Sequence, residues 1–208
     1  MSFRVLHDYP RRAHLEFYRR YPSAYYSVCF ELEAGLLRRQ LKAAGLSTYA
    51  GFCWAFHRAL LAIDAFRVRL AGEDVVVHDV LRLGLTVPAP GRTFSFVNLE
   101  WHADPSIFFP AAAEAMTRAS AQVDLSGGGE APDFVYYTAV PRLPFTAITH
   151  VPLADPAAGQ PAIAFGKFRE EGERLLVPVG VQVNHMYIDG ADLGELYDGV
   201  QASFTRGL

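Results

Sequence analysis

One histidine combines the residue type and the setting that general-base catalysis requires. His185 follows an apolar, β-rich run at 175–184, and Asp189 and Gly190 come four and five residues after it. A neutral imidazole accepts a proton near pH 7, and the end of a buried strand holds it in a fixed place. The same pattern is typical of a structural histidine in a core. These residues alone therefore leave the catalytic and the structural interpretations open.

The other reactive side chains give weaker signals. The remaining histidines show neither HExxH spacing nor a cluster with cysteine, so we expect no metal site. His57 lies in an apolar segment and is expected in the core or at an interface. Cys29 and Cys53 also lie in apolar segments and are expected to be reduced. The glycines at 127–129 precede no Lys-Ser or Lys-Thr pair, which argues against a phosphate-binding loop.

The composition is that of a globular protein. Of 208 residues, 51% are hydrophobic and 20% are charged, which fits one domain over 1–208. The net charge of −3 argues against a nucleic-acid partner, because domains that bind nucleic acids are usually basic. No apolar run approaches the ~20 residues that a membrane helix needs. The first residues show no apolar signal segment, so we expect a cytoplasmic protein.

The elements that must position His185 can be read from apolar periodicity. Helical spacing, with Asp8 and Ser47 as candidate N-caps, predicts helices at 8–20, 33–44, 49–64, 105–121 and 190–204. Alternating or β-favouring runs predict strands at 25–32, 66–70, 75–78, 81–87, 92–99, 134–139, 145–150, 162–169 and 175–184. Loops are expected at 126–132 and 153–161. The interleaving predicts an α/β (α+β) fold with a large mixed sheet packed by helices.

In addition, several motifs resemble the chloramphenicol acetyltransferase family, from about residue 9 to the C-terminus. The strongest is GVQVNHMYIDG followed by a helix, which is similar to the family's active-site strand and its HHxxxDG signature. The others are FGKFREEGERLLVPV, YPRRAHLEFYRR, DAFRVRLAGEDVVVHD and PRLPFTAIT. The resemblance implies a two-layer subunit that assembles as a homotrimer with active sites at the subunit interfaces.

The resemblance also implies a reaction and a set of site residues. The reaction is transfer of an acetyl group from acetyl-CoA to a hydroxyl of a small molecule, chloramphenicol or another acceptor, without a metal. His185 would be the general base, with Asp189 and Arg11 paired as its structural support. The residues that would bind the acceptor are Tyr18, Phe145, Thr146 and Ala147, and those that would contact CoA are Lys167 and Phe168.

The chain also departs from the family pattern. The first histidine of the family's HH pair is Asn184, and the family tryptophan after Pro141 is Arg142. Ala147 and Ala164 stand where the family has a serine that donates to the oxyanion and a threonine that supports it, and Ser47 stands where a lysine binds the CoA 3′-phosphate. Loss of one oxyanion donor typically lowers turnover by about 10²–10³-fold. An alternative is therefore a catalytically reduced relative, either a small-molecule binder or a structural homotrimer.

Overall fold

The computed structural model describes residues 2–126 and 131–208. Its helices are α1 (Arg12–Tyr18), α2 (Gly35–Ala43), α3 (Thr48–Leu61), α4 (Pro105–Ser120) and α5 (Gly190–Arg206), and a 3-10 helix η1 spans Asp64–Arg67. Its strands are β1 (Phe3–Val5), β2 (Tyr25–Glu33), β3 (Val68–Ala71), β4 (Asp74–His78), β5 (Arg82–Ala89), β6 (Thr93–Leu99), β7 (Phe134–Ala139), β8 (Ala162–Phe165), β9 (Arg169–Glu171) and β10 (Arg174–Asn184).

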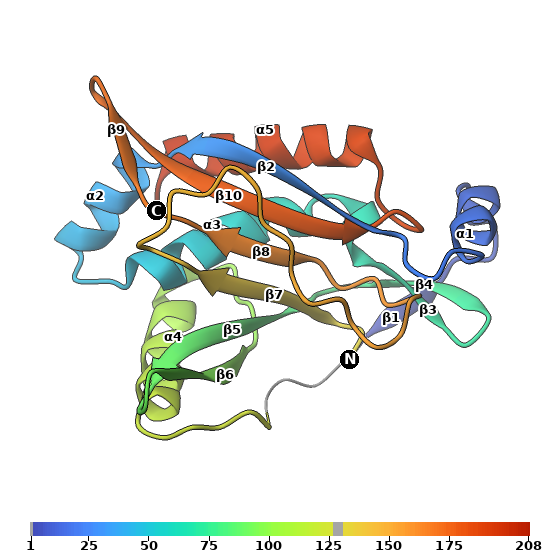
Figure 1. The fold of residues 1–208 in the computed structure, drawn as a ribbon, viewed down its shortest axis with the longest axis horizontal. Coiled ribbons are helices and arrows are strands. Elements are labelled where there is room, and N and C mark those ends of the chain that lie inside the picture. Colours follow the sequence, from blue (N-terminus) through green and yellow to red (C-terminus); the bar gives the residue numbers. More distant parts are fainter. Residues whose placement is uncertain (1, 127–130) are drawn as a thin grey trace.

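The described strands form a large and a small sheet (Figure 1). The large sheet has the order β2-β10-β8-β7-β5-β6, and β9 pairs with the first part of β10. Strand β7 runs parallel to β5 and to β8, whereas the remaining neighbours are antiparallel. The sheet is therefore mixed, as the sequence predicts. The small sheet, β1-β4-β3, lies at the end of the molecule that carries α1.

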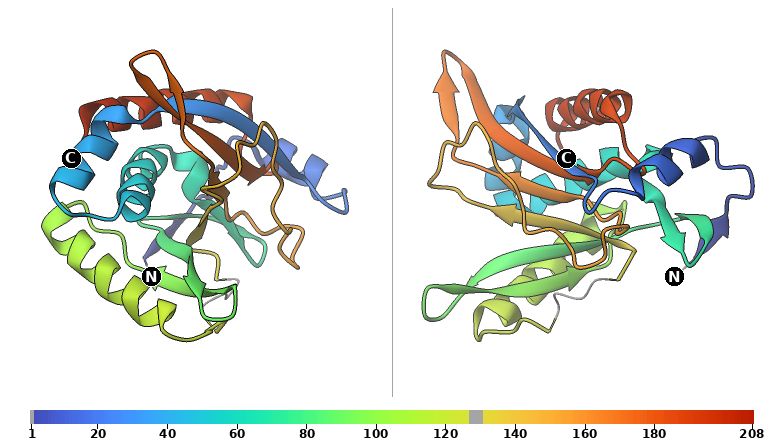
Figure 2. Two further views of the ribbon diagram at one scale, coloured as in Figure 1. Left: turned by 60° about the vertical axis from the view of Figure 1, so that its left-hand side comes forward. Right: turned by 45° about the vertical axis from the view of Figure 1, so that its right-hand side comes forward.

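Helices α3, α4 and α5 cover one face of the large sheet, with α3 between the other two (Figure 2). The Ser47 hydroxyl accepts a hydrogen bond from the Ala50 N–H at 3.3 Å and so caps α3, as its residue type predicts. Trp54, Phe52 and Phe56 are almost fully buried along this helix. Burial of such side chains contributes about 1.5–3 kcal/mol each, which explains why α3 is apolar nearly all round.

The opposite face of β10 is covered by an irregular segment, residues 140–161. The Ile148 side chain packs on Gly180, where an added Cβ would lie only 2.1 Å from Ile148 Cγ2. The His150 N–H donates to the Gln182 side-chain oxygen at 2.8 Å. The strand predicted at 145–150 is therefore wrong, because this stretch crosses the face of the sheet and its contacts are made with side chains rather than with a neighbouring strand.

The large sheet divides between β5 and β7. Their parallel pairing begins at Arg82 and Phe134 and ends at Leu85 and Tyr137. Beyond that point β5 continues with β6, and β7 continues with β8 as far as Phe165. The two halves of the sheet diverge there (Figure 1). This division opens a space within the sheet that no pattern in the sequence indicates.

Most other predicted elements are confirmed with small shifts. The first helix spans Arg12–Tyr18 and not 8–20, and its N-cap is Arg11 instead of Asp8. The run at 162–169 is divided into β8 and the start of β9, and β1 was not predicted. The loop expected at 126–132 lies mostly outside the described residues. Among the described residues, no helix has the length and hydropathy that crossing a bilayer requires.

Candidate active site

The His185 imidazole is held between two tyrosine rings directly after β10. The Tyr18 ring stacks on it, with centroids 4.4 Å apart and planes inclined by 13°, and the Tyr26 ring lies 4.6 Å away on a tilt of 33°. The backbone N–H of His185 donates to the Ala24 carbonyl oxygen at 2.9 Å. Burial raises the pKa of Tyr26 to about 12, so its hydroxyl stays protonated and donates to the Ile188 oxygen. The partly exposed imidazole therefore has a fixed orientation.

The turn after His185 is fixed by an ion pair between Arg11 and Asp192. The Arg11 guanidinium binds both carboxylate oxygens of Asp192, with Nη2 at 2.8 Å from Oδ1, and Nη1 also donates to the Tyr187 oxygen. Asp189 lies farther from Arg11, at 3.8 Å, and its carboxylate caps α5 by accepting from the Ala191 N–H at 2.8 Å. Arg11 and Asp189 are thus brought together as expected, but Asp192 is the closer partner.

Electrostatics favour the charged forms of this network. Burial raises the pKa of Asp189, but the backbone N–H groups of Ala191 and Asp192 and the charge of Arg11 together lower it below its usual value. The hydrogen bond with Asp192 raises the pKa of Arg11. Because Asp192 also accepts from the Asp189 N–H at 2.8 Å, the two aspartates form a reciprocal capping box at the start of α5.

Asn184 has a structural role at the family's first histidine position. Its side-chain N–H groups donate to the carbonyl oxygens of Pro156 and Ala158, both at 2.9 Å, and its oxygen accepts from the Met186 N–H at 3.0 Å. These bonds fasten the 140–161 segment to the end of β10. The departure at Asn184 therefore supports the position of His185 without adding a second imidazole.

Two cavities meet at the division between β5 and β7. A cavity of about 610 Å³ lies on the face that is crossed by the 140–161 segment, and its wall includes Phe94, Phe96 and Tyr136. A cavity of about 380 Å³ lies on the helix side, between residues of α3 and α4. The two cavities share four wall residues, which are Thr86, Val87, Pro88 and Ala139.

Hydroxyl groups lie where the cavities meet. The Thr86 and Thr138 hydroxyl groups form a hydrogen bond with each other, with their oxygens 2.8 Å apart. The Tyr49 hydroxyl donates to the Tyr137 carbonyl oxygen at 2.8 Å, at the end of the β5–β7 pairing. Thr138 is paired in register with the fully buried Ala164 of β8. A hydroxyl group is therefore present on β7, a strand next to Ala164, and it is hydrogen-bonded to Thr86 of β5.

The smaller cavity is lined mostly by apolar side chains. Phe168, predicted to contact CoA, lies in its wall together with Tyr49 and Phe52, and Lys167 lies directly beside it with an exposed side chain. Mostly apolar cavities with a few polar groups are typical of small-molecule and cofactor sites. Ser47 lies next to this wall, where its hydroxyl is used to cap α3.

The predicted acceptor residues do not all meet His185 within one chain. Tyr18 stacks on it, but Phe145 packs on Gly166, and Thr146 and Ala147 are exposed. Ile148, the residue after Ala147, packs on Gly180. Gly180 precedes His185 by five residues, which corresponds to a distance of about 16 Å along the strand. Neither of the two cavities includes His185 in its wall.

Two other histidines can be assigned from their surroundings. His57 is fully buried and lies between the Tyr137 hydroxyl and the Leu81 carbonyl oxygen, and burial lowers its pKa to about 3. It is a core residue, as expected. His150 lines the larger cavity, but its Nε2 atom is buried with no hydrogen-bond partner in the part of the chain that the structure describes, and burial lowers its pKa. The described residues contain no group of three or more His, Cys, Asp or Glu side chains that could hold a metal ion.

Several site residues could not have been identified from the sequence. Tyr26 contacts His185 only because β2 pairs with β10, and Thr86 and Thr138 meet only across the divided sheet. Asp192 did have a local signal, since it lies three residues after the N-cap Asp189 and so completes a capping box.

Comparisons with known proteins agree with this geometry. A family model described as chloramphenicol acetyltransferase matches residues 2–201. The chain is 24% identical over 196 residues to chloramphenicol acetyltransferase 3 of Escherichia coli, covering 93% of this chain and 92% of that protein. It is 27% identical over 203 residues to a chloramphenicol acetyltransferase of Streptomyces acrimycini, covering 94% and 90%.

Solved structures share the fold. One chloramphenicol acetyltransferase structure superposes with a TM-score of 0.87 at 23% identity, covering 98% of this chain and all of that one (100%). A dihydrolipoamide acetyltransferase of Azotobacter vinelandii gives a TM-score of 0.66 at 15% identity, covering 92% and 85%. At these identities the superpositions establish the arrangement of elements, whereas the match over residues 2–201 concerns the sequence itself.

Proposed function

Because the chain belongs to the chloramphenicol acetyltransferase family, we propose that it transfers an acetyl group from acetyl-CoA to a hydroxyl of a small molecule, with His185 as the general base. The observation that supports this most strongly is the imidazole held between Tyr18 and Tyr26 at the end of β10. Two aromatic faces and a tethered backbone fix its orientation while leaving it partly exposed. Positioned imidazoles of this kind contribute about 10²–10⁴-fold to proton-transfer steps.

In the proposed reaction, His185 removes the proton from the acceptor hydroxyl as the hydroxyl oxygen attacks the thioester carbonyl carbon. The new C–O bond forms as the π bond of the carbonyl breaks and its charge moves onto the carbonyl oxygen. Collapse of this oxyanion then breaks the C–S bond, and the proton passes from His185 to the departing thiolate. No covalent acyl-enzyme is required. Arg11 and Asp192 contribute by holding the turn that follows the histidine.

The two cavities support a reaction in which the substrates enter from opposite faces of the sheet. The larger cavity, with its aromatic wall, suits the acceptor, and the smaller one suits the apolar arm of the acyl donor. The bonded hydroxyls of Thr86 and Thr138 lie where the cavities share a wall. We assign to them the polar contact with the developing oxyanion, since Ala147 and Ala164 offer none.

A homotrimer would complete this site. Val151 (90% exposed), which lines the larger cavity, and Leu143 (59% exposed) are apolar and lie on the 140–161 segment. Exposed apolar residues around a cavity are typical of a protein interface. We propose that the His185 of one subunit projects into the opening between β5 and β7 of the next. The free thiols of Cys29 and Cys53 suit the cytoplasmic location that we also propose.

The test is thiol release from acetyl-CoA in the presence of a panel of hydroxylated acceptors, beginning with chloramphenicol. The wild type should release CoA only when an acceptor is present, and His185→Ala should reduce this rate by about 10²–10⁴-fold. His7→Ala, which replaces an exposed histidine, is the matched control and should keep the wild-type rate. A His185→Ala enzyme with wild-type turnover would rule out the base assignment. A wild type that is inactive with every acceptor would favour the catalytically reduced alternative.

A further inference from the structure

Three basic side chains lie next to wall residues of the smaller cavity and have no acidic partner among the described residues. Arg38 lies on α2 against Phe168, Arg142 follows the wall residue Pro141, and Lys167 directly precedes Phe168. We call these three residues the basic rim. None of them forms an ion pair with any residue that the structure describes. Unpaired cations beside an apolar cavity suit a ligand with an apolar arm and an anionic head.

Arg38 has the most defined position of the three. The carbon at the centre of its guanidinium lies 4.9 Å from the centroid of the Phe168 ring. Phe168 in turn meets Phe52 edge-on at 5.8 Å, and both rings lie in the cavity wall. This stack holds a planar cation at the edge of the cavity. A guanidinium that is stacked on an aromatic ring keeps its N–H groups free to bind a phosphate in bidentate geometry.

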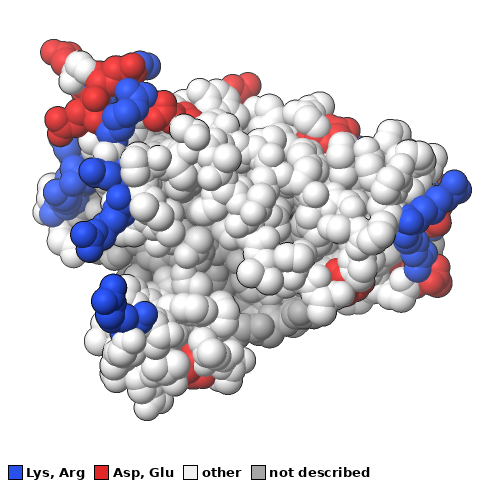
Figure 3. All heavy atoms as spheres, viewed as in Figure 1, with Lys and Arg blue, Asp and Glu red and all other residues white. Residues whose placement is uncertain are grey.

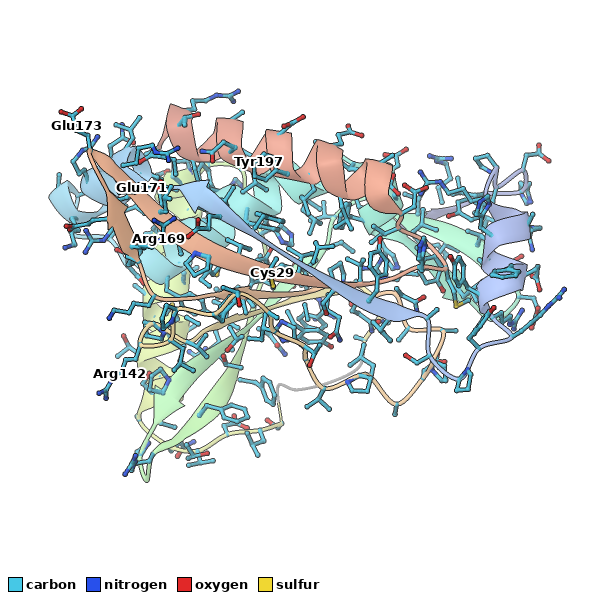
Figure 4. All side chains as sticks on the ribbon, turned by 45° about the horizontal axis from the view of Figure 1, so that its top comes forward. Cys29, Arg142, Arg169, Glu171, Glu173 and Tyr197 are labelled. Carbon is cyan, nitrogen blue, oxygen red and sulfur yellow. The ribbon has the colours of Figure 1, made fainter. Side chains whose placement is uncertain are left out.

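The charges nearby leave the rim positive. Lys and Arg atoms gather at the end of the molecule that carries α2, below a group of Asp and Glu atoms at the tip of the β9 hairpin (Figure 3). Arg142 lies at this same end, apart from the neighbouring Arg169 and Glu171 (Figure 4). Glu31 and Glu171 do not neutralise the rim, because both are paired with Arg169, at 2.7 Å and 3.5 Å. On a chain with a net charge of −3, this is a local site of attraction for anions.

We propose that Arg38 binds a phosphate group of CoA and so supplies a cation that Ser47 cannot. The inference rests on the proposed function, because it takes CoA as the ligand of the smaller cavity. Ser47 carries no charge, and its hydroxyl accepts from the Ala50 N–H. Arg38 reaches the same cavity from α2 instead of from the start of α3. Lys167 and Arg142 add positive charge to the rim.

Calorimetric titration with CoA tests this without an acceptor. Arg38→Gln should raise the Kd for CoA on the order of tenfold, since hydrogen bonds to charged groups are worth about that factor or more. Arg38→Lys keeps the positive charge but loses the planar guanidinium that can bind a phosphate through two hydrogen bonds, and it should give an intermediate Kd for CoA. Arg39→Gln is the matched control. It makes the same charge change on the next residue of α2, whose guanidinium lies against Gly35 and not on Phe168.

Salt and a second ligand sharpen the result. The Kd of the wild type for CoA should rise with salt more steeply than that of Arg38→Gln, because one phosphate contact is missing in the variant. If Arg38 binds the 3′-phosphate, Arg38→Gln should not change the Kd for 3′-dephospho-CoA. If Arg38 binds the pyrophosphate, Arg38→Gln should raise the Kd for CoA and for 3′-dephospho-CoA by the same factor.

The outcomes separate this inference from the proposed function. Equal Kd values for CoA in the wild type, Arg38→Gln and Arg39→Gln would overturn the role of Arg38 and leave the acetyltransferase assignment intact. A wild type that binds no CoA would overturn both. Melting temperatures within a few degrees of the wild type would show that the variants fold, as expected for an exchange between two good helix formers on a partly exposed site.

Discussion

The end of β10 and the opening between β5 and β7 differ in what they provide. At the end of β10, His185 is oriented by Tyr18, Tyr26 and a bonded backbone, but neither cavity adjoins it. At the opening there is space for two ligands and a pair of hydroxyls. One region has a positioned base without a cavity, and the other has cavities whose wall includes His150, a histidine with its Nε2 atom buried. The comparison favours an active site assembled from two copies of the chain.

The largest effect within the second region should follow removal of a hydroxyl where the cavities meet. Thr138→Val replaces the hydroxyl by a methyl group of similar size. If the Thr86–Thr138 pair stabilises the oxyanion, kcat should fall on the order of 10²-fold, while the Kd for CoA stays unchanged. Thr93→Val is the control, because Thr93 also lines the larger cavity but lies on β6. Equal kcat values for Thr138→Val and Thr93→Val would mean that the opening between β5 and β7 accommodates the substrates but does not stabilise the oxyanion.

The first region should depend on Asp192 more than on Asp189. Asp192→Asn leaves the Arg11 guanidinium without its bidentate partner, and we expect a loss of about 2–3 kcal/mol in the free energy of unfolding. Asp189→Asn should cost less than about 0.5 kcal/mol, since Asn and Asp are equally good N-caps. Urea denaturation of both variants measures the difference. The reverse order would restore Asp189 as the main partner of Arg11.

A smaller effect concerns pH and the wall behind the larger cavity. His57, bonded to the Tyr137 hydroxyl, is buried with a pKa of about 3, against an ordinary value of 6.5. Because the pKa of His57 is lower in the folded state than in the unfolded chain, the neutral histidine contributes its full share to the free energy of unfolding above pH 6.5. This contribution is lost as the pH falls below 6.5, where the unfolded chain takes up a proton and the folded protein does not. From pH 7 to pH 5.5 the loss is about 1.2 kcal/mol. Thermal melts of His57→Gln should show a shallower dependence over this range, and an unchanged slope would contradict the assignment.

The sequence predicted those parts of the molecule that depend on local signals. Helix α3 is predicted because Ser47 and an apolar run are contiguous, and β10 because its run is mostly apolar and rich in β-favouring residues. The expected strand at 145–150 was wrong, because an extended, apolar stretch can also lie across a sheet without pairing within it. Sequence periodicity reports which residues are buried, and it does not report which element covers them.

The candidate site divides in the same way. His185 and its support by Arg11 are expected from motifs, and the structure places Arg11 beside Asp189 and on the Tyr187 oxygen, in the turn that follows His185. The contributions of Tyr26 and Thr138 depend on strand pairing between β2 and β10 and on the division beside β7. Neither follows from residue type or spacing. A cavity within a sheet depends on where two strands cease to pair, which is a tertiary property.

The most direct test of an active site shared between copies is complementation between two inactive variants. His185→Ala lacks the base but keeps the cavities, and Ala162→Trp keeps the base but fills the larger cavity, whose wall includes Ala162. Differently tagged variants would be denatured together, refolded, and checked for mixed oligomers by native mass spectrometry. If each site combines the base of one copy with the cavities of the next, a 1:1 mixture should recover about a quarter of the wild-type rate per site. Mixed oligomers that stay as inactive as their parents would contradict the shared site.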